Sequence, residues 1–383
     1  MSPAVQAVLA AIPILLILFL MVWAHWSAAR AGTAGFLITL VLAAAAFEWY
    51  PELGYVRAVS GAVLEAVFVA TTILWIIFAA LSLHHLQVRV GAIDVLRQAI
   101  GSVSRDRRLV AILVAWFFAL FMEGAAGFGT PVALAAPFLV SFGFRPVEAV
   151  TLALIGHAVG VSFGAVGTPI LPQIAATGFT GLELSRSVGL FHSLVGWVLL
   201  VFVVRIASRD LPPRSSRIWP WVLLAAAAFF LPYAVIARWI GPELPTLGGA
   251  LIGGTVFIGL LQLTQRHRSG ADSTGSDPRP DTALLLRAAG PYLALVGIIL
   301  VTRLIPAIEE AVTAPVLEWR WEGHFRGSFQ PLYHPGTVLF LGFLSTGLFQ
   351  KARGTDVTAS MKTAARQLGP VVIALMTMLG KAA

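Results

Sequence analysis

The chain has 383 residues, of which 58% are hydrophobic and only 11% are charged. A soluble domain of ordinary composition carries about 25% charged residues, so this composition excludes a soluble protein. The absence of cysteine excludes disulfides and cysteine chemistry, and the net charge of +8 comes from basic residues in short loops without a nucleic-acid-binding motif, so we expect no nucleic-acid partner.

Long apolar runs follow one another along the chain, and about 20 such residues cross a bilayer as a helix. We therefore predict an all-α polytopic membrane protein whose surroundings are the lipid bilayer. The first run is expected to stay as a helix, because no Lys or Arg precedes it as in a signal peptide. The predicted single spans are Ala4–Ala24, Thr33–Phe47, Val59–Leu83, Val188–Ile206, Trp219–Ala237, Leu247–Leu263, Ala288–Thr302 and Thr337–Phe349.

These runs divide the chain into five segments. Residues 1–108 hold three spans and a cytoplasmic loop, 109–178 hold two interrupted stretches, 179–263 hold further spans, 264–282 form a flexible cytoplasmic linker, and 283–383 hold the last spans. The final run begins near Leu368 and is short of a full crossing. Threading the spans alternately places 19 basic residues on one side and 6 on the other. Because cytoplasmic loops accumulate Lys and Arg, we predict that the basic loops face the cytoplasm and the N-terminus lies outside.

The stretch Leu109–Phe144 is too short to cross the membrane twice. It has 36 residues between Arg108 and Arg145, whereas two crossings need about 40 residues and a turn. Its glycine-rich middle, Glu123–Pro131, disfavours a continuous helix. We predict a re-entrant hairpin whose turn lies at membrane depth, buried in protein or lining an aqueous cavity.

The following stretch, residues 148–178, is interrupted in a similar way at Gly164–Pro169. We predict a crossing helix that breaks inside the membrane. Both breaks end in Gly-Thr-Pro, where Thr suits the N-cap and Pro the first position of a new helix. The two new helices would then begin at Thr130–Pro131 and at Thr168–Pro169.

Two helix N-termini that converge inside a bilayer would form an anion site. Each offers unpaired N–H groups and about half a positive charge, so no buried Arg or Lys is needed. The alternative is that the glycines only permit close helix packing and the prolines only kink the helices. The predicted substrate-binding residues are Gly127, Gly129, Thr130, Pro131, His157, Ser162, Gly167 and Thr168.

Glu123 is the predicted proton-coupling residue. It lies about 22 Å along the hairpin arm from Arg108, where a carboxylate is costly and therefore a functional candidate. The alternative role is a structural cap on the glycine-rich turn. His157 is either a proton relay or a packing histidine, and the hydroxyls of Ser162 and Thr168 serve either a substrate or their own helix backbone.

No catalytic constellation is present in the sequence. There is no HExxH, GxSxG or GxxxxGK[ST] motif, so we expect neither an enzyme nor an ATP-driven pump, and no cofactor or metal. The residues leave a sodium-coupled carboxylate carrier open, since unwound carbonyls can hold Na⁺. They also leave open a channel or a non-transporting membrane subunit, as well as the oligomeric state.

The run Phe121–Ala133 closely resembles the lactate permease family, and so do Ser162–Pro169, Thr302–Leu304 and Leu332–Gly336. The resemblance implies an inverted-repeat secondary transporter of the bacterial inner membrane that moves L-lactate, D-lactate and glycolate by symport with a proton. Family members continue beyond this point with a second hairpin rich in Gly, Ser, Asn and Thr. We therefore expect a truncated chain whose second repeat is incomplete.

Overall fold

The computed structural model describes residues 2–47, 52–101, 103–104, 106–127, 130–209, 218–269 and 281–379. Within these ranges, nine helices are long and apolar enough to cross a membrane, which confirms the predicted all-α polytopic membrane protein. The helices are α1 (Pro3–Val22), α2 (Ala28–Ala46), α3 (Tyr55–Arg89), α4 (Ala92–Gly101), α5 (Arg107–Ala111), the π-helix η1 (Ile112–Phe118), α6 (Ala119–Ala125), α7 (Thr130–Ser141), α8 (Pro146–His157), the 3-10 helix η2 (Ala158–Phe163), α9 (Gly164–Gly167), α10 (Ile170–Thr177), α11 (Gly181–Val195), α12 (Trp197–Ala207), α13 (Trp219–Trp239), α14 (Pro245–Ser269), α15 (Thr282–Leu304), α16 (Pro306–Thr313), α17 (Pro335–Gln350) and α18 (Gly354–Leu379).

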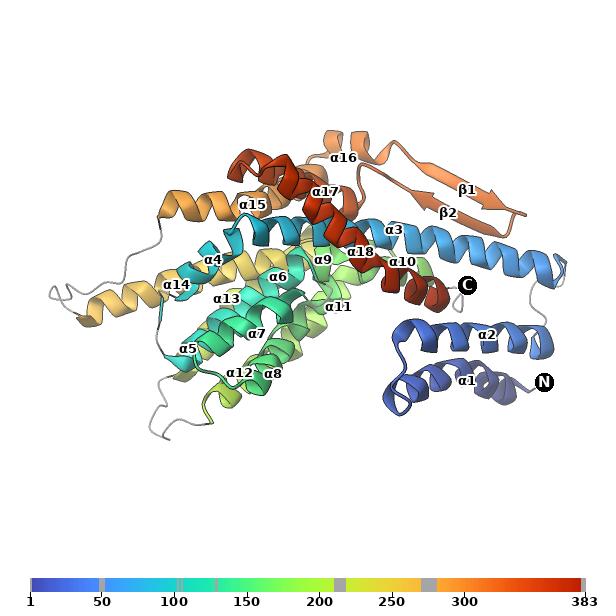
Figure 1. The fold of residues 1–383 in the computed structure, drawn as a ribbon, viewed down its shortest axis with the longest axis horizontal. Coiled ribbons are helices and arrows are strands. Elements are labelled where there is room, and N and C mark those ends of the chain that lie inside the picture. The colour runs from blue at the N-terminus through green and yellow to red at the C-terminus, as the bar shows by residue number, and fades with distance from the viewer. Residues whose placement is uncertain are drawn as a thin grey trace.

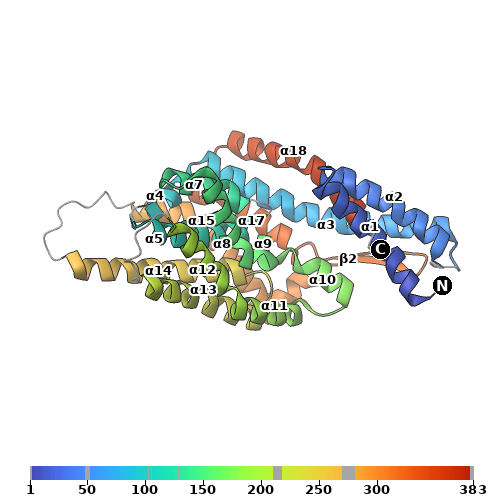
Figure 2. The same ribbon diagram turned by 90° about the horizontal axis from the view of Figure 1, so that it is seen from below.

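The long helix α3 connects two parts of the molecule. Its 35 residues extend about 52 Å, well beyond the predicted span, and the added C-terminal residues include the buried His84, Leu86 and Gln87. Its first half lies at the same end of the molecule as the pair α1–α2, in which α2 packs on α18, and its second half lies beside the bundle that contains α4 to α15 (Figures 1 and 2). The outer face of α1 is exposed and apolar, as expected of a helix that faces lipid.

Two C-terminal helices flank α3. The indole of Trp75 donates to Thr337 on α17, while His85 Nε2 lies 3.0 Å from the side-chain oxygen of Gln367 on α18. The last apolar run, from about Leu368, is only the second half of a longer helix, because α18 begins 14 residues earlier at Gly354. Its charged first half is helical because it presents an apolar stripe that includes the buried Ala364 to α3.

A β-hairpin replaces part of the predicted external loop between Glu309 and His334. Strand β1 (Leu317–Trp321) pairs antiparallel with β2 (Phe325–Phe329), and the hairpin lies along the first half of α3 (Figure 1). The ring of Phe325 occupies the space that the missing side chain of Gly61 leaves on α3. The hairpin is thus anchored by a long-range contact that the sequence does not reveal.

Three other predicted boundaries were wrong. The span expected from Val188 begins at Gly181 and bends at Gly196, which has no side chain and packs closely against Val159. The predicted linker overlaps the end of α14, which continues to Ser269; residues 270–280 of this linker lie outside the described ranges. The short helix α4 lies inside the predicted loop after the third span.

Candidate functional site: two helix breaks that meet

The first break lies at the end of an arm formed by α5, η1 and α6, in which every residue from Leu109 to Ala125 is buried. Glu123 is in the last turn of α6 and is 5% exposed. The chain then turns through Gly127, whose φ of +57° favours glycine, and returns as α7. Both arms end at the same side, since Glu148 at the start of α8 pairs with Arg107 at 3.3 Å and with Arg145 at 3.6 Å. The predicted hairpin is therefore present, and its depth in the membrane remains a prediction.

The second break confirms the predicted interruption of the next helix. After α8 the chain continues as the 3-10 helix η2, and then Ala165, Val166 and Gly167 all have positive φ values of 42°, 56° and 78°. A left-handed conformation costs a residue with a side chain about 1–2 kcal/mol. Two such residues in succession show that packing around the break enforces its shape, as is common at functional sites.

The two breaks touch each other. A Cβ atom built on Gly127 would lie only 3.1 Å from the Cβ atom of Ala165. A Cβ atom built on Gly164 would collide with Oε1 of Glu123. The absence of side chains at these two glycines therefore lets the hairpin turn and the broken helix approach, and it leaves room for the carboxylate between them.

Glu123 and His157, which the sequence singled out separately, form a pair. Nε2 of His157 lies 3.8 Å from Oε2 of Glu123, and their side chains are 11% and 7% exposed. Nδ1 of His157 donates to the carbonyl oxygen of Ala153 at 2.6 Å, because a carbonyl can only accept. In the neutral ring Nε2 is then the basic atom that faces Glu123, and at 3.8 Å the two groups lie within ion-pair range but beyond hydrogen-bond distance.

The prediction that Thr130 and Thr168 act as N-caps was wrong. Thr130 is itself the first residue of α7, and Pro169 takes the N-cap position of α10. The Thr130 hydroxyl donates to the carbonyl of Gly127 at 2.7 Å, and the Thr168 hydroxyl donates to that of Ala165 at 2.6 Å. Each hydroxyl thus bonds to the carbonyl three residues earlier, which also accepts the backbone N–H of the same threonine, and the two breaks share this arrangement.

The remaining predicted substrate residues have different positions. Pro131 is buried in the first turn of α7, whereas Gly129 lies outside the described residues. Gly167 packs under the backbone of Pro242, in the loop before α14. Ser162 is turned away toward α11, where its Oγ lies 3.4 Å from Nε2 of His192.

The loop before α14 and the start of α14 cover the second break, and the sequence did not predict this. Residues 241–250 are all buried, although their first part was read as an external loop. Thr246 donates a hydrogen bond of 2.9 Å to the carbonyl of Gly160, and Gly124 allows the backbone of Leu247 to approach α6. The Gly-Pro-Glu-Leu-Pro run from Gly241 to Pro245 was the available signal, because an acidic residue between prolines is unusual among apolar spans.

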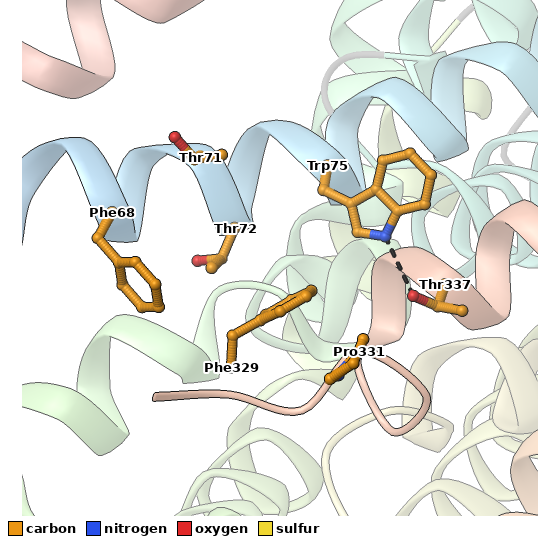
Figure 3. A pocket seen from close by; sticks show the side chains of 7 residues that line it. All are labelled: Phe68, Thr71, Thr72, Trp75, Phe329, Pro331 and Thr337. Carbon is orange, nitrogen blue, oxygen red and sulfur yellow. Dashed lines mark hydrogen bonds between the residues drawn. The ribbon is translucent and has the colours of Figure 1, made fainter. Parts of the chain in front are cut away.

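A separate cavity of about 390 Å³ lies between α3 and the segment that leads into α17 (Figure 3). The indole of Trp75 donates to Thr337 across it, and the hydroxyls of Thr71 and Thr72 bond to their own helix. The cavity therefore offers little to a charged ligand. Within the described part of the chain, no three His, Asp or Glu side chains gather as metal ligands would.

Comparison with known proteins identifies the family. The sequence model described as L-lactate permease matches residues 6–383. The chain belongs to the L-lactate permease family. It is 30% identical over 337 residues to the L-lactate permease of Bacillus subtilis (strain 168), covering 84% of this chain and 57% of that protein.

Two Escherichia coli (strain K12) relatives are also similar. The L-lactate permease is 32% identical over 266 residues, covering 67% of this chain and 48% of the relative, and the glycolate permease GlcA is 32% identical over 247 residues, covering 64% and 43%. The chain thus spans about half the length of these permeases. No solved structure matches it.

Proposed function

We propose that the chain is a secondary carrier, rather than an enzyme, that moves lactate and glycolate together with a proton across the bacterial cell membrane. The observation that carries the proposal is the position of the Glu123 carboxylate, which lies between His157 and Gly164 where the two breaks meet. The names of the relatives, L-lactate permease and glycolate permease, support the substrate class.

In this proposal the substrate carboxylate binds to main-chain N–H groups at the starts of α7 and α10. The first N–H groups of a helix have no partner within the helix and carry partial positive charge. The contact between Gly127 and Ala165 supports the convergence of these starts, because α7 begins three residues after Gly127 and α10 begins five residues after Ala165. The hydroxyls of Thr130 and Thr168 stabilise the two turns instead of binding the substrate, because each donates to a carbonyl.

The Glu123–His157 pair carries the coupled proton in this proposal. A bare charge is costly inside a bilayer, so a site that binds an anion and a proton together lowers the barrier to movement. With one proton on either Glu123 or His157, the loaded site has the same net charge as the empty, deprotonated site. Coupled movement of one anion and one proton is then electroneutral.

The proposed orientation places the basic ends of the helices in the cytoplasm and the β-hairpin outside. The ion pairs of Arg107 and Arg145 with Glu148 lie at the cytoplasmic end in this orientation. The antiparallel packing of α18 on α3, with Arg89 beside Thr363 and His85 beside Gln367, supports an inverted repeat.

The test is uptake of labelled L-lactate by proteoliposomes that contain the chain. An acidic exterior should drive accumulation above the external concentration, and replacing sodium with choline should leave it unchanged. Accumulation that requires sodium would contradict proton coupling, and flux without accumulation would indicate a channel. Absence of any uptake would contradict the assignment of transport to this chain.

A further inference from the structure

The 3-10 helix η2 separates the two groups that contact Glu123. His157 immediately precedes η2, and Gly164 immediately follows it. A 3-10 helix rises about 2.0 Å per residue and an α-helix about 1.5 Å, so the six residues of η2 are about 3 Å longer than as an α-helix. Relaxation of η2 would therefore move His157 or Gly164 by up to about 3 Å relative to Glu123.

The side chain of Thr246, in the first turn of α14, holds η2 from one side. Thr246 is fully buried, and its hydroxyl donates to the carbonyl of Gly160 at 2.9 Å. A Cβ atom built on Gly160 would lie 2.6 Å from the Thr246 methyl carbon, so the contact requires glycine. These two residues are 86 positions apart in the sequence, and the bond connects two separate helices.

The backbone of η2 explains why the Gly160 carbonyl accepts this bond. In an α-helix that carbonyl would accept from the N–H of Gly164, four residues later. Here the N–H of Gly164 donates to Val161 instead. In the 3-10 form this carbonyl faces the N–H of Phe163, three residues later, and its second lone pair accepts the Thr246 hydroxyl. The bond from Thr246 thus holds the carbonyl in the position that it has in the 3-10 form.

A second contact holds η2 at a different position around the helix. Oγ of Ser162 lies 3.4 Å from Nε2 of His192, and Nδ1 of His192 lies 2.9 Å from the hydroxyl of Tyr233. His192 and Tyr233 belong to α11 and α13, which pack on each other, and α13 packs on α14. The three packed helices α11, α13 and α14 therefore hold η2 through two contacts, at Gly160 and at Ser162.

We propose that Thr246 is a positioning residue that keeps η2 in its 3-10 form and thereby keeps Nε2 of His157 facing Glu123. The inference rests on the proposed function, since the positioned pair is the one that carries the coupled proton. Among the described side chains, the charged group within 4 Å of the His157 ring is Glu123, from α6. Loss of the Thr246 hydroxyl is expected to move Nε2 of His157 away from Glu123 and lower the affinity of the pair for the coupled proton.

The experiment compares Thr246→Val, which removes the hydroxyl but keeps the shape, with Thr246→Ser, which keeps the hydroxyl. Thr255→Val is the matched control, because Thr255 is also on α14 but donates to its own helix at Leu251. Hydrogen exchange of the purified proteins reports on η2, and the pH dependence of L-lactate uptake by proteoliposomes reports on the proton site.

In Thr246→Val we expect amides 159–164 to exchange at least about tenfold faster, and half-maximal uptake to require about threefold more protons. Thr246→Ser and Thr255→Val should resemble the unchanged protein in both measurements. Unchanged exchange in Thr246→Val, faster exchange with an unchanged pH profile, or an equal effect of Thr255→Val would each overturn the inference. Lack of uptake by the unchanged protein would instead contradict the proposed function, and hydrogen exchange would still decide whether Thr246 holds η2.

Discussion

Gly164 decides whether the Glu123 carboxylate fits between the two breaks. Its φ of −68° and ψ of 157° suit any residue, so the backbone itself does not require glycine. The requirement comes from Oε1 of Glu123, which occupies the place of the missing Cβ atom. Glycine is therefore needed at position 164 because a side chain would collide with the carboxylate, and not because of its backbone angles.

Gly164→Ala is expected to displace the Glu123 carboxylate and reduce L-lactate uptake at least about tenfold, because small displacements at a binding site can cost that much. Uptake by proteoliposomes, normalised to the amount of folded protein, is the measurement. Gly259→Ala on α14 is the control, since no atom lies within 4 Å of the added methyl group. Similar uptake by the two variants would show that the contact with Glu123 does not matter.

Among the elements, the broken helix carries the largest conformational cost. Ala165 and Val166 adopt left-handed conformations at about 1–2 kcal/mol each, and packing against the hairpin turn must offset that cost. Glycine at Ala165 would remove this penalty, but it would also lose a buried methyl group and add chain entropy on unfolding. These contributions are of similar size and opposite sign.

Ala165→Gly should therefore change the free energy of unfolding by less than about 0.5 kcal/mol. Ala153→Gly, at a fully buried position inside α8, has no penalty to relieve and should lower it by about 1.5–2 kcal/mol. Thermal unfolding of the purified proteins in detergent compares the two. An equally large loss in both would mean that the left-handed turn is not strained.

The sequence was sufficient for elements whose signal is local. Apolar length predicted the spans, and the glycine-rich runs predicted both breaks, because these properties belong to neighbouring residues. Two contacts were not predictable, because each joins residues far apart in the chain. They are the hydrogen bond from Thr246 to Gly160 and the packing of Phe325 against Gly61, which anchors the β-hairpin. The N-cap prediction failed for a different, local reason: the carbonyls of Gly127 and Ala165, three residues earlier in each turn, accept the threonine hydroxyls.

On the scale of the whole molecule, the proposed orientation separates the β-hairpin from the connection between α17 and α18. Because the chain has no cysteine, single cysteines can be introduced without a background signal. Glu318 on the hairpin and Thr355 at the start of α18 are both exposed.

We expect Glu318→Cys to react with a membrane-impermeant maleimide in intact cells, and Thr355→Cys to react only after the membrane is opened. The reason is that the excess of basic residues places the Thr355 side in the cytoplasm. Labelling in the reverse order would invert the orientation, and labelling of both in intact cells would contradict the alternate threading of the helices.

In the proposed function, Glu123 lies where the two breaks meet and carries the coupled proton. The most direct measurement follows the pH inside proteoliposomes while L-lactate enters, comparing Glu123→Gln with Glu148→Gln, a second buried glutamate that lies at the base of the hairpin. We expect L-lactate entry to acidify the interior of proteoliposomes that contain Glu148→Gln, but not of those that contain Glu123→Gln. Acidification by Glu123→Gln equal to that of the unchanged protein would contradict this expectation.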